Sequence, residues 1–253
     1  MNDNFLVSVI TPTFNSSKFI ISTYDSLYNQ TYTNWEWLVV DDCSDDDTYK
    51  ILCDIAIKDN RVKALKNPEN SGAAITRNVA MDNSSGDFLA FLDADDMWLP
   101  EKLATQIQYM VSSNIYFSFT GYEIIDESGH SLGIEVDTFH KSKLSYNDML
   151  RKKATLGCST VMLDFRKFKK FRMPNIRTGQ DYAFWLKILK NDNYTYPVSN
   201  VLTKYRIVSN SISRNKYKKA MRQWQIYREI ENLTLFKSIK CFCFYAWRAV
   251  FRK

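Results

Sequence analysis

Short apolar runs alternate with amphipathic stretches through the first 120 residues, and only short polar connections separate them. Five of the runs have the length and composition of buried strands: Leu6–Thr11, Trp35–Asp41, Val62–Lys66, Phe88–Leu92 and Ile115–Thr120. The stretches between them carry apolar residues at helical spacing: Lys18–Asn29, Asp46–Lys58, Ala73–Asp82 and Glu101–Ser112. This alternation predicts an α/β fold in which right-handed crossovers build a parallel sheet.

The fourth apolar run ends in a cluster of carboxylates. Asp93, Asp95 and Asp96 follow Phe88–Leu92 directly, and Pro100 is suited to open the next helix. Adjacent carboxylates repel one another, and a bound cation would remove that cost. Oxygen ligands of this kind suit Mg²⁺ or Mn²⁺, which keep part of their coordination shell for substrate phosphates. On its own the segment is equally compatible with a solvated acidic turn or a helix cap.

Polar residues also follow the first three apolar runs. They are Thr11, Pro12, Thr13 and Asn15 after the first, Asp41 and Asp42 after the second, and Asn70, Gly72 and Arg77 after the third. Because the carboxyl ends of parallel strands meet at one edge of a sheet, we expect all four groups to converge on a ligand there. Carboxylates can accept hydrogen bonds from a base or a ribose, and an arginine can bind a diphosphate or the acidic cluster. Each group alone is more often a turn or a cap.

The composition argues against several classes of enzyme. The two histidines, His130 and His140, lie in a polar stretch, which argues against a histidine-based hydrolase or a zinc enzyme. Five cysteines at unpatterned spacings predict reduced thiols in the cytoplasm. The first residues lack the features of a signal peptide, and no stretch is apolar for long enough to span a membrane.

After Gly121 the pattern is less regular. We expect mixed strand character at Tyr122–Val136 and Ser159–Leu163, and an aromatic helix at Gly179–Lys190. A pair of short strands should follow, one around Pro197 and one at Leu202–Arg206, and the chain should be helical from Lys216 onward.

The C-terminal segment differs in charge from the rest of the chain. From Lys204 onward there are 13 Lys and Arg residues and two acids, whereas acids outnumber bases, 26 to 21, in the remainder. Residues 235–253 carry apolar side chains at helical spacing together with Lys237, Lys240, Arg248, Arg252 and Lys253. This pattern predicts a helix at an anionic membrane surface, with packing against the domain or a second subunit as the alternative.

Four motifs in this order resemble the family-two glycosyltransferases of the GT-A fold: TPTFN (11–15), VVDDCSDDDT (39–48), NSGAAITRN (70–78) and FLDADD (91–96). The resemblance covers residues 5 to about 205. It implies a Rossmann-type mixed α/β sheet flanked by helices, followed by a C-terminal helical basic tail. Residues 1–120 would form the half that binds the nucleotide sugar, residues 121–210 the half with the acceptor site and catalytic base, and residues 211–253 the tail.

The resemblance implies a role for each matching residue. Residues from all four motifs would line the nucleotide pocket: Thr11, Pro12, Thr13, Asn15, Asn70, Gly72 and Ala94. Asp42 would read the base with support from Asp41, and Arg77 would lie near the base or the diphosphate. Asp93 and Asp95 would form the DxD motif, with Asp95 on the divalent metal and Asp93 on the metal, the ribose or the sugar.

Inverting transfer needs a base that takes the proton of the acceptor hydroxyl as this attacks the anomeric carbon. The segment RTGQDYAFWLKIL (177–189) resembles the acidic pair of the family, and Asp181 matches the residue assigned as base. Gln180 stands where many members have Glu, so a second carboxylate is missing there. On the acceptor side we place Asp96, Gln180 and Trp185, with Trp185 as well suited to core packing as to stacking on a sugar.

The resemblance therefore implies transfer of a sugar from a nucleotide donor, here taken as a UDP-hexose, with Mn²⁺ or Mg²⁺ as cofactor. The acceptor would be a lipid-linked saccharide at the cytoplasmic face of a bacterial membrane, in O-antigen or capsule synthesis. Processive members carry a QxxRW signature, which Arg222, Gln223 and Trp224 do not form, so we expect one sugar per acceptor.

Other functions compete with this interpretation. A haloacid-dehalogenase-type phosphatase also places DxD after a strand, but nearer the N-terminus and followed by Thr or Val rather than Met97. A nucleotidyltransferase needs a Gly-rich basic loop, which TPTFN does not provide. A non-catalytic module would bind nucleic acid or a membrane through the tail, and the acidic remainder of the chain argues against nucleic acid.

Overall fold

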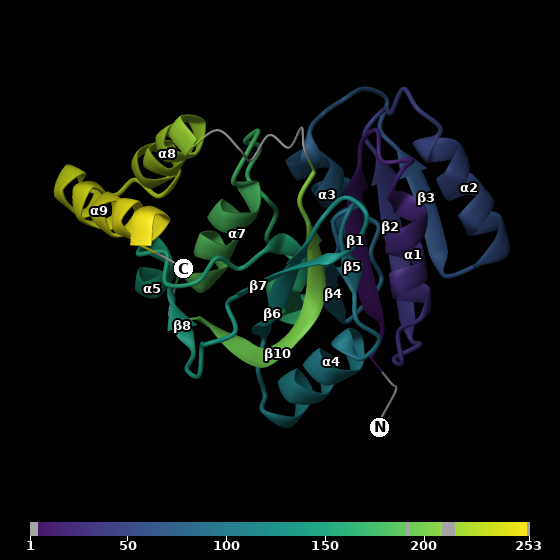
Figure 1. Ribbon diagram of the computed structural model, residues 1–253, viewed down its shortest axis with the longest axis horizontal. Helices are drawn as coiled ribbons and strands as arrows, with labels where there is room; N and C mark the ends of the chain where they lie inside the picture. The colour runs from purple at the N-terminus through teal and green to yellow at the C-terminus, as the bar shows by residue number, and fades with distance from the viewer. Residues whose placement is uncertain (1–4, 191–192, 209–215, 252–253) are drawn as a thin grey trace.

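The computed structural model describes residues 5–190, 193–208 and 216–251, and shows a mixed sheet covered by helices (Figure 1). Ten strands form the sheet within these residues: β1 (Val7–Thr13), β2 (Trp35–Asp41), β3 (Val62–Lys66), β4 (Phe88–Phe91), β5 (Met97–Trp98), β6 (Phe117–Ile125), β7 (Ser131–Val136), β8 (Leu144–Ser145), β9 (Val161–Asp164) and β10 (Tyr194–Arg206).

The helices fall largely where helical periodicity predicts them. They are α1 (Ile20–Tyr28), α2 (Thr48–Lys58), α3 (Ala73–Asp82), α4 (Lys102–Ser112), α5 (Tyr146–Leu150), α6 (Phe165–Phe168), α7 (Gln180–Leu189), α8 (Lys216–Gln225) and α9 (Leu235–Phe251). A 3₁₀ turn, η1 (Cys158–Thr160), precedes β9, and a π-helix, η3 (Ile226–Ile230), follows α8 directly.

The sheet runs in the order β3-β2-β1-β4-β9-β6-β10-β5. The first four of these strands are parallel, whereas β9 lies antiparallel between β4 and β6. The expected α/β sheet with flanking helices is therefore confirmed. Its mixed character comes from β9 in the middle of the sheet and from β5, β7 and β8, which also pair antiparallel with their neighbours. The expected pair of short strands near Pro197 is wrong, because β10 is one strand whose pairing with β6 shifts register after Val198.

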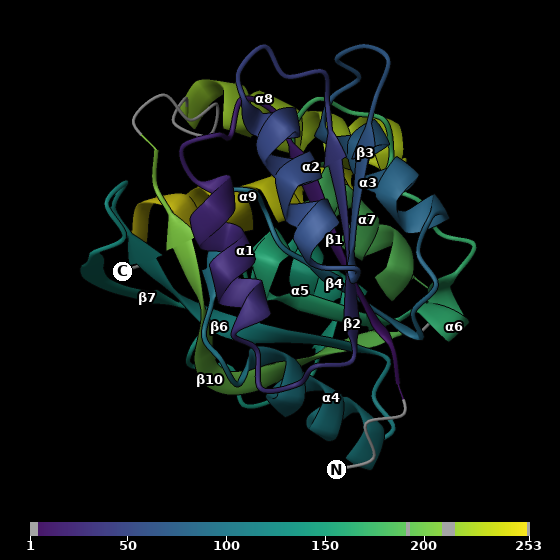
Figure 2. The same cartoon turned by 90° about the vertical axis from the view of Figure 1, so that its right-hand side faces the viewer.

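Side chains alternate between the two faces of each central strand. One set packs with α3 and α7 and includes Ile10, Leu38 and Phe91. The other set packs with α1, α2 and α4 and includes Val9, Val39 and Ala90. Figure 2 shows α1 on one side of β1 and β4 and α7 on the other. This parity decides which polar residues at the strand ends can meet.

The C-terminal helices lie against α5 and α7 (Figure 1). Ile226, Tyr227 and Cys241 are buried in the same core as α7, and the Tyr227 hydroxyl donates to the Leu150 carbonyl at 2.5 Å. One side of the C-terminal segment thus packs against the domain, which is the alternative to membrane binding that the sequence left open. Residues 211–215, Arg252 and Lys253 lie outside the described residues. Among the described helices, none has the length and apolarity to cross a membrane.

Candidate active site

Arg77 pairs with the acidic loop after β4 and lies within electrostatic range of the start of α7. Its Nη2 donates to Asp93 Oδ1 at 2.5 Å, and the residue is only 5% exposed. Burial alone would lower the pKa of Arg77, but the nearby carboxylates of Asp93 and Asp181 raise it above its ordinary value. Asp181 therefore lies within electrostatic range of a residue that comes about a hundred positions earlier. Arg77 Nε and Nη1 have no protein partner in the described structure, so two donors remain for an anion.

Asp95 lies half-buried beside Asp93. Burial and the charge of Asp93 raise the pKa of Asp95 to about 6, against the opposing effect of Arg206 and Arg77. A cation between the two carboxylates would relieve this repulsion, which fits a divalent metal. No group of three or more candidate ligand side chains exists among the described residues. Two carboxylates suffice for Mg²⁺ or Mn²⁺ when substrate phosphates and water complete the shell.

Asp96 has a structural position, which corrects its assignment to the acceptor side. It is 1% exposed, and its oxygens accept hydrogen bonds from the Ser159 hydroxyl at 2.5 Å and the Arg206 backbone N–H at 2.9 Å. The Ser159 hydroxyl oxygen also accepts from the Asp93 N–H, and Arg206 Nε donates to the Asp95 carbonyl. Ser159, from η1, and Arg206, from β10, thus shape the DxD loop. Sequence reasoning missed both, because no local pattern marks a partner so distant in the chain.

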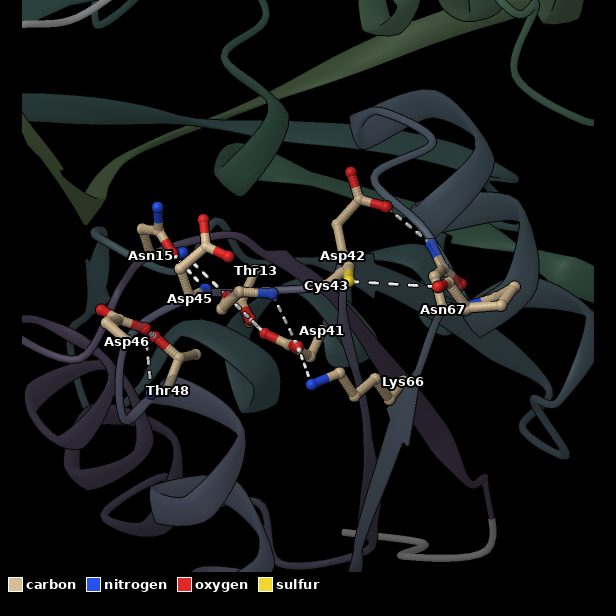
Figure 3. Close-up of polar contacts among 12 residues, drawn as sticks. Thr13, Asn15, Asp41, Asp42, Cys43, Asp45, Asp46, Thr48, Lys66 and Asn67 are labelled. Carbon is tan, nitrogen blue, oxygen red and sulfur yellow. Dashed lines mark hydrogen bonds and ion pairs between the residues drawn. The ribbon is translucent and has the colours of Figure 1, made fainter.

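Asp42 fixes the loop that leads into α3 (Figure 3). Its Oδ1 accepts hydrogen bonds from Asn67 Nδ2 at 2.8 Å and the Ser71 N–H at 2.9 Å, and its Oδ2 accepts from the Gly72 N–H at 2.7 Å. Burial would raise the pKa of Asp42, but these donors lower it below its usual range. Gly72 has a φ of +84°, a conformation that favours glycine, as it starts the helix that carries Arg77.

The hydroxyl groups of Thr11 and Thr13, two residues that the resemblance places at the nucleotide pocket, face inward. Trp37 Nε1 donates to Thr11 Oγ1 at 2.8 Å, and the Thr13 hydroxyl donates to Asp41 at 3.3 Å. Both hydroxyls therefore lie on the α1 and α2 side of the sheet, together with the buried Asp41. Parity places Pro12 on the opposite side, the side of Asp42.

Three further pocket candidates hold different positions. Asn15 Oδ1 accepts from the Asp45 N–H at 2.9 Å and ties the first loop to the second (Figure 3). Asn70 is exposed on the loop before α3. Ala94 is buried, and its carbonyl accepts from the Thr23 hydroxyl. Of these, Asn15 and Asn70 have exposed side chains that a ligand can reach.

Helix α7 begins beside the acidic cluster. Asp181 lies in its first turn, is half-buried, and accepts a hydrogen bond from the Tyr182 N–H at 2.7 Å. The Gln180 side-chain oxygen is buried without a described partner. Trp185 is 0% exposed and packs on the rings of Phe91, Phe117 and Phe184 at centroid distances of 5.3, 5.4 and 5.3 Å. Stacking of Trp185 on a sugar is therefore wrong, and Trp185 is a core residue.

Relatives of known family share almost the whole chain. The model for glycosyl transferase family 2 matches residues 8–171. The putative teichuronic acid biosynthesis glycosyltransferase TuaG of Bacillus subtilis is 43% identical over 245 residues, 97% of this chain and 96% of TuaG. The UDP-Glc:alpha-D-GlcNAc-diphosphoundecaprenol beta-1,3-glucosyltransferase WfgD of Escherichia coli is 40% identical over 233 residues, 91% of this chain and 88% of WfgD.

Solved structures share the fold. S. aureus TarS in complex with UDP-GlcNAc has a TM-score of 0.75 at 22% identity, covering 97% of this chain and 73% of that one. The mannosyltransferase PcManGT from Pyrobaculum calidifontis, in complex with GDP-Man and Mn²⁺, has a TM-score of 0.66 at 16% identity, covering 97% and 70%. Motifs, topology and relatives agree, and the chain belongs to glycosyl transferase family 2.

Proposed function

We propose that this glycosyltransferase moves one sugar, with inversion, from a UDP-hexose to a lipid-linked saccharide in the synthesis of a bacterial surface polysaccharide. Two relatives support the substrates: TuaG is named for teichuronic acid biosynthesis, and WfgD for glucose transfer from UDP-Glc to a diphosphoundecaprenol-linked sugar. The enzyme would act at the cytoplasmic face of the membrane, where such acceptors are anchored.

The observation that carries this proposal is the convergence of Arg77, Asp93 and Asp181. Asp181 accepts the proton of the acceptor hydroxyl while that oxygen attacks the anomeric carbon and the nucleoside diphosphate leaves. Arg77 directs its two unpaired donors toward the charge of the leaving group. Asp93 and Asp95 would hold Mn²⁺ or Mg²⁺, which supplies charge neutralisation for the diphosphate when bound.

The nucleotide lies, in this proposal, at the ends of β1 and β2. Asp42 holds the loop of residues 67–72 so that the backbone of Gly72 and the side chain of Asn70 border the base. Pro12 and Asn15 border it from the first loop. Asp41, Thr11 and Thr13 support these loops from the buried side.

Replacing Asp181 by Asn tests the base. We expect transfer to fall by orders of magnitude while affinity for UDP, measured by calorimetry with Mn²⁺, stays nearly unchanged. Asp54→Asn, the same change at an exposed position on α2, serves as the control. Near-normal turnover of Asp181→Asn would remove this residue as the base.

The metal site has a separate test. Asp95→Ala should abolish the dependence of UDP affinity on Mn²⁺, because the donor set loses one of two carboxylates. Unchanged affinity of Asp95→Ala for UDP in the presence of Mn²⁺ would refute this assignment. A panel of UDP-sugars, scored by Mn²⁺-dependent thermal stabilisation of the wild type, identifies the donor.

A further inference from the structure

Helix α9 has apolar residues on two opposite sides. Its inner side carries Ser238, Cys241 and Phe242 against the domain, where Phe242 meets the ring of Trp224 edge-on at 5.6 Å. Its outer side carries the residues that we call the outer stripe: Phe236, Ile239, Cys243 and Trp247. Because they are spaced three or four residues apart, these four lie on one face of the helix.

The outer stripe is exposed to an extent that ordinary surface helices avoid. Phe236 is 80% exposed, Trp247 64% and Ile239 47%. A helix that is solvated on its outer side carries polar residues there, and large exposed apolar patches mark binding surfaces. The exposed area of the outer stripe therefore offers a binding surface that faces away from the domain.

Charge indicates the nature of that partner. Helix α9 contains no acidic residue, and its charged residues are Lys237, Lys240 and Arg248. Lys237 and Lys240 are exposed and flank the outer stripe on one side. Apolar side chains next to basic ones fit the boundary between acyl chains and anionic headgroups of a bilayer. A second copy of the chain is less suited, because pairing two such stripes face to face would bring like charges together.

We propose that the outer stripe of α9 seats the enzyme on anionic phospholipid membranes, with Phe236, Ile239 and Trp247 inserted and Lys237 and Lys240 on the phosphates. The helix lies in the membrane surface and does not cross it, as its length and polar residues require. The purpose of this contact rests on the proposed function, since a lipid-linked acceptor is itself held in the bilayer.

The seated tail also contacts the segment that carries the catalytic base. Arg222 Nε, in α8, donates to the Thr178 hydroxyl at 3.2 Å, and Ile226 packs at Gly179, two residues before Asp181. Both contacts come from the segment that α9 anchors. The membrane contact thereby fixes the orientation of the start of α7 relative to the bilayer.

Cosedimentation of the full chain with vesicles tests the proposal. We expect binding to phosphatidylcholine vesicles that contain phosphatidylglycerol, weak binding to phosphatidylcholine alone, and release by salt. The double change Phe236→Ser and Trp247→Ser should weaken binding at least about tenfold, since two large side chains no longer insert. Lys237→Gln with Lys240→Gln should weaken binding to anionic vesicles by about 30-fold.

Ile57→Ser is the matched control, because Ile57 is 83% exposed on α2, away from the tail. It should bind as the wild type does, and thermal unfolding verifies that every variant is folded. Equal binding of all variants, or no preference for anionic vesicles, would overturn the proposal. A second contrary outcome is a dimer of the wild type in light scattering that the double change Phe236→Ser and Trp247→Ser converts to monomers, together with no binding of the wild type to vesicles. That outcome would also overturn the proposal. Binding requires no sugar transfer, so Asp181→Asn should bind normally even if the proposed reaction is wrong.

Discussion

The change Asp42→Asn tests whether one buried carboxylate holds the loop of residues 67–72. The three hydrogen bonds that Asp42 accepts come from Asn67, Ser71 and Gly72. Asparagine has nearly the same shape but only one acceptor oxygen. Its better orientation keeps this oxygen toward Asn67 and Ser71 and turns the NH₂ group toward the Gly72 N–H, so two donors face each other.

The magnitude follows from this geometry. A hydrogen bond to a charged acceptor contributes about 1.5–3 kcal/mol, and an unsatisfied buried donor costs about 1–3 kcal/mol. We therefore expect Asp42→Asn to lower the free energy of unfolding at pH 7 by about 2–3 kcal/mol, measured by urea denaturation. Asp45→Asn makes the same charge change at an exposed position of the neighbouring loop and should stay within about 0.5 kcal/mol of the wild type.

The stabilisation that Asp42 provides should depend on pH in a direction set by its pKa. Because the folded protein holds the pKa of Asp42 below its usual range, its stabilisation is complete above the unfolded pKa of about 4. It is lost as the pH falls through the lowered pKa of the folded state. The gap between wild type and Asp42→Asn should be constant from about pH 5 to 7 and narrow toward pH 3. A gap no larger than that of Asp45→Asn, or one that does not change with pH, would refute the reasoning.

Two further changes test buried features outside the reacting groups. Lys102 is fully buried, its Nζ lies 3.7 Å from the Trp98 ring centroid without a described hydrogen-bond partner, and burial lowers the pKa of Lys102 well below normal. Lys102→Met should raise the free energy of unfolding at pH 7 by about 1–2 kcal/mol. The gain should shrink toward pH 10, because at neutral pH the Lys102 amine of the wild type binds a proton only in the unfolded state. Destabilisation at pH 7 would show instead that Trp98 holds a charged amine. Gly179 has a φ of +71°, and an added Cβ would lie 3.1 Å from Ile226 Cδ1. Gly179→Ala should cost about 1–2 kcal/mol in thermal unfolding and reduce kcat more than donor affinity, and Ile226→Val should restore part of the loss; an unchanged kcat would separate this turn from Asp181.

The sequence by itself determined the sheet of the first half and the location of its binding edge. The runs at Trp35–Asp41 and Val62–Lys66 match β2 and β3 residue for residue. Burial on both faces explains the apolar composition of β2, whereas β3 lies at the edge of the sheet and is fully buried only at Val62. The DxD cluster and Arg77 could be identified from the sequence because each belongs to a short motif whose residues are close together in the chain. Asp93, after the end of β4, and Arg77, in α3, do meet, because α3 packs across β1, the strand that pairs with β4.

Only the tertiary structure decided which way each of these side chains faces. Thr11 and Asp96 turn toward buried partners, Trp37 and Arg206, and Trp185 packs in the core. A local pattern cannot reveal this, since a strand has two faces and the helices that cover them come from elsewhere in the chain. The same holds for β9, which lies between β4 and β6 although it follows both of them in the chain. Helix α9 shows the limit most clearly: periodicity identifies an apolar helix, but only its packing reveals that a second apolar face is left exposed.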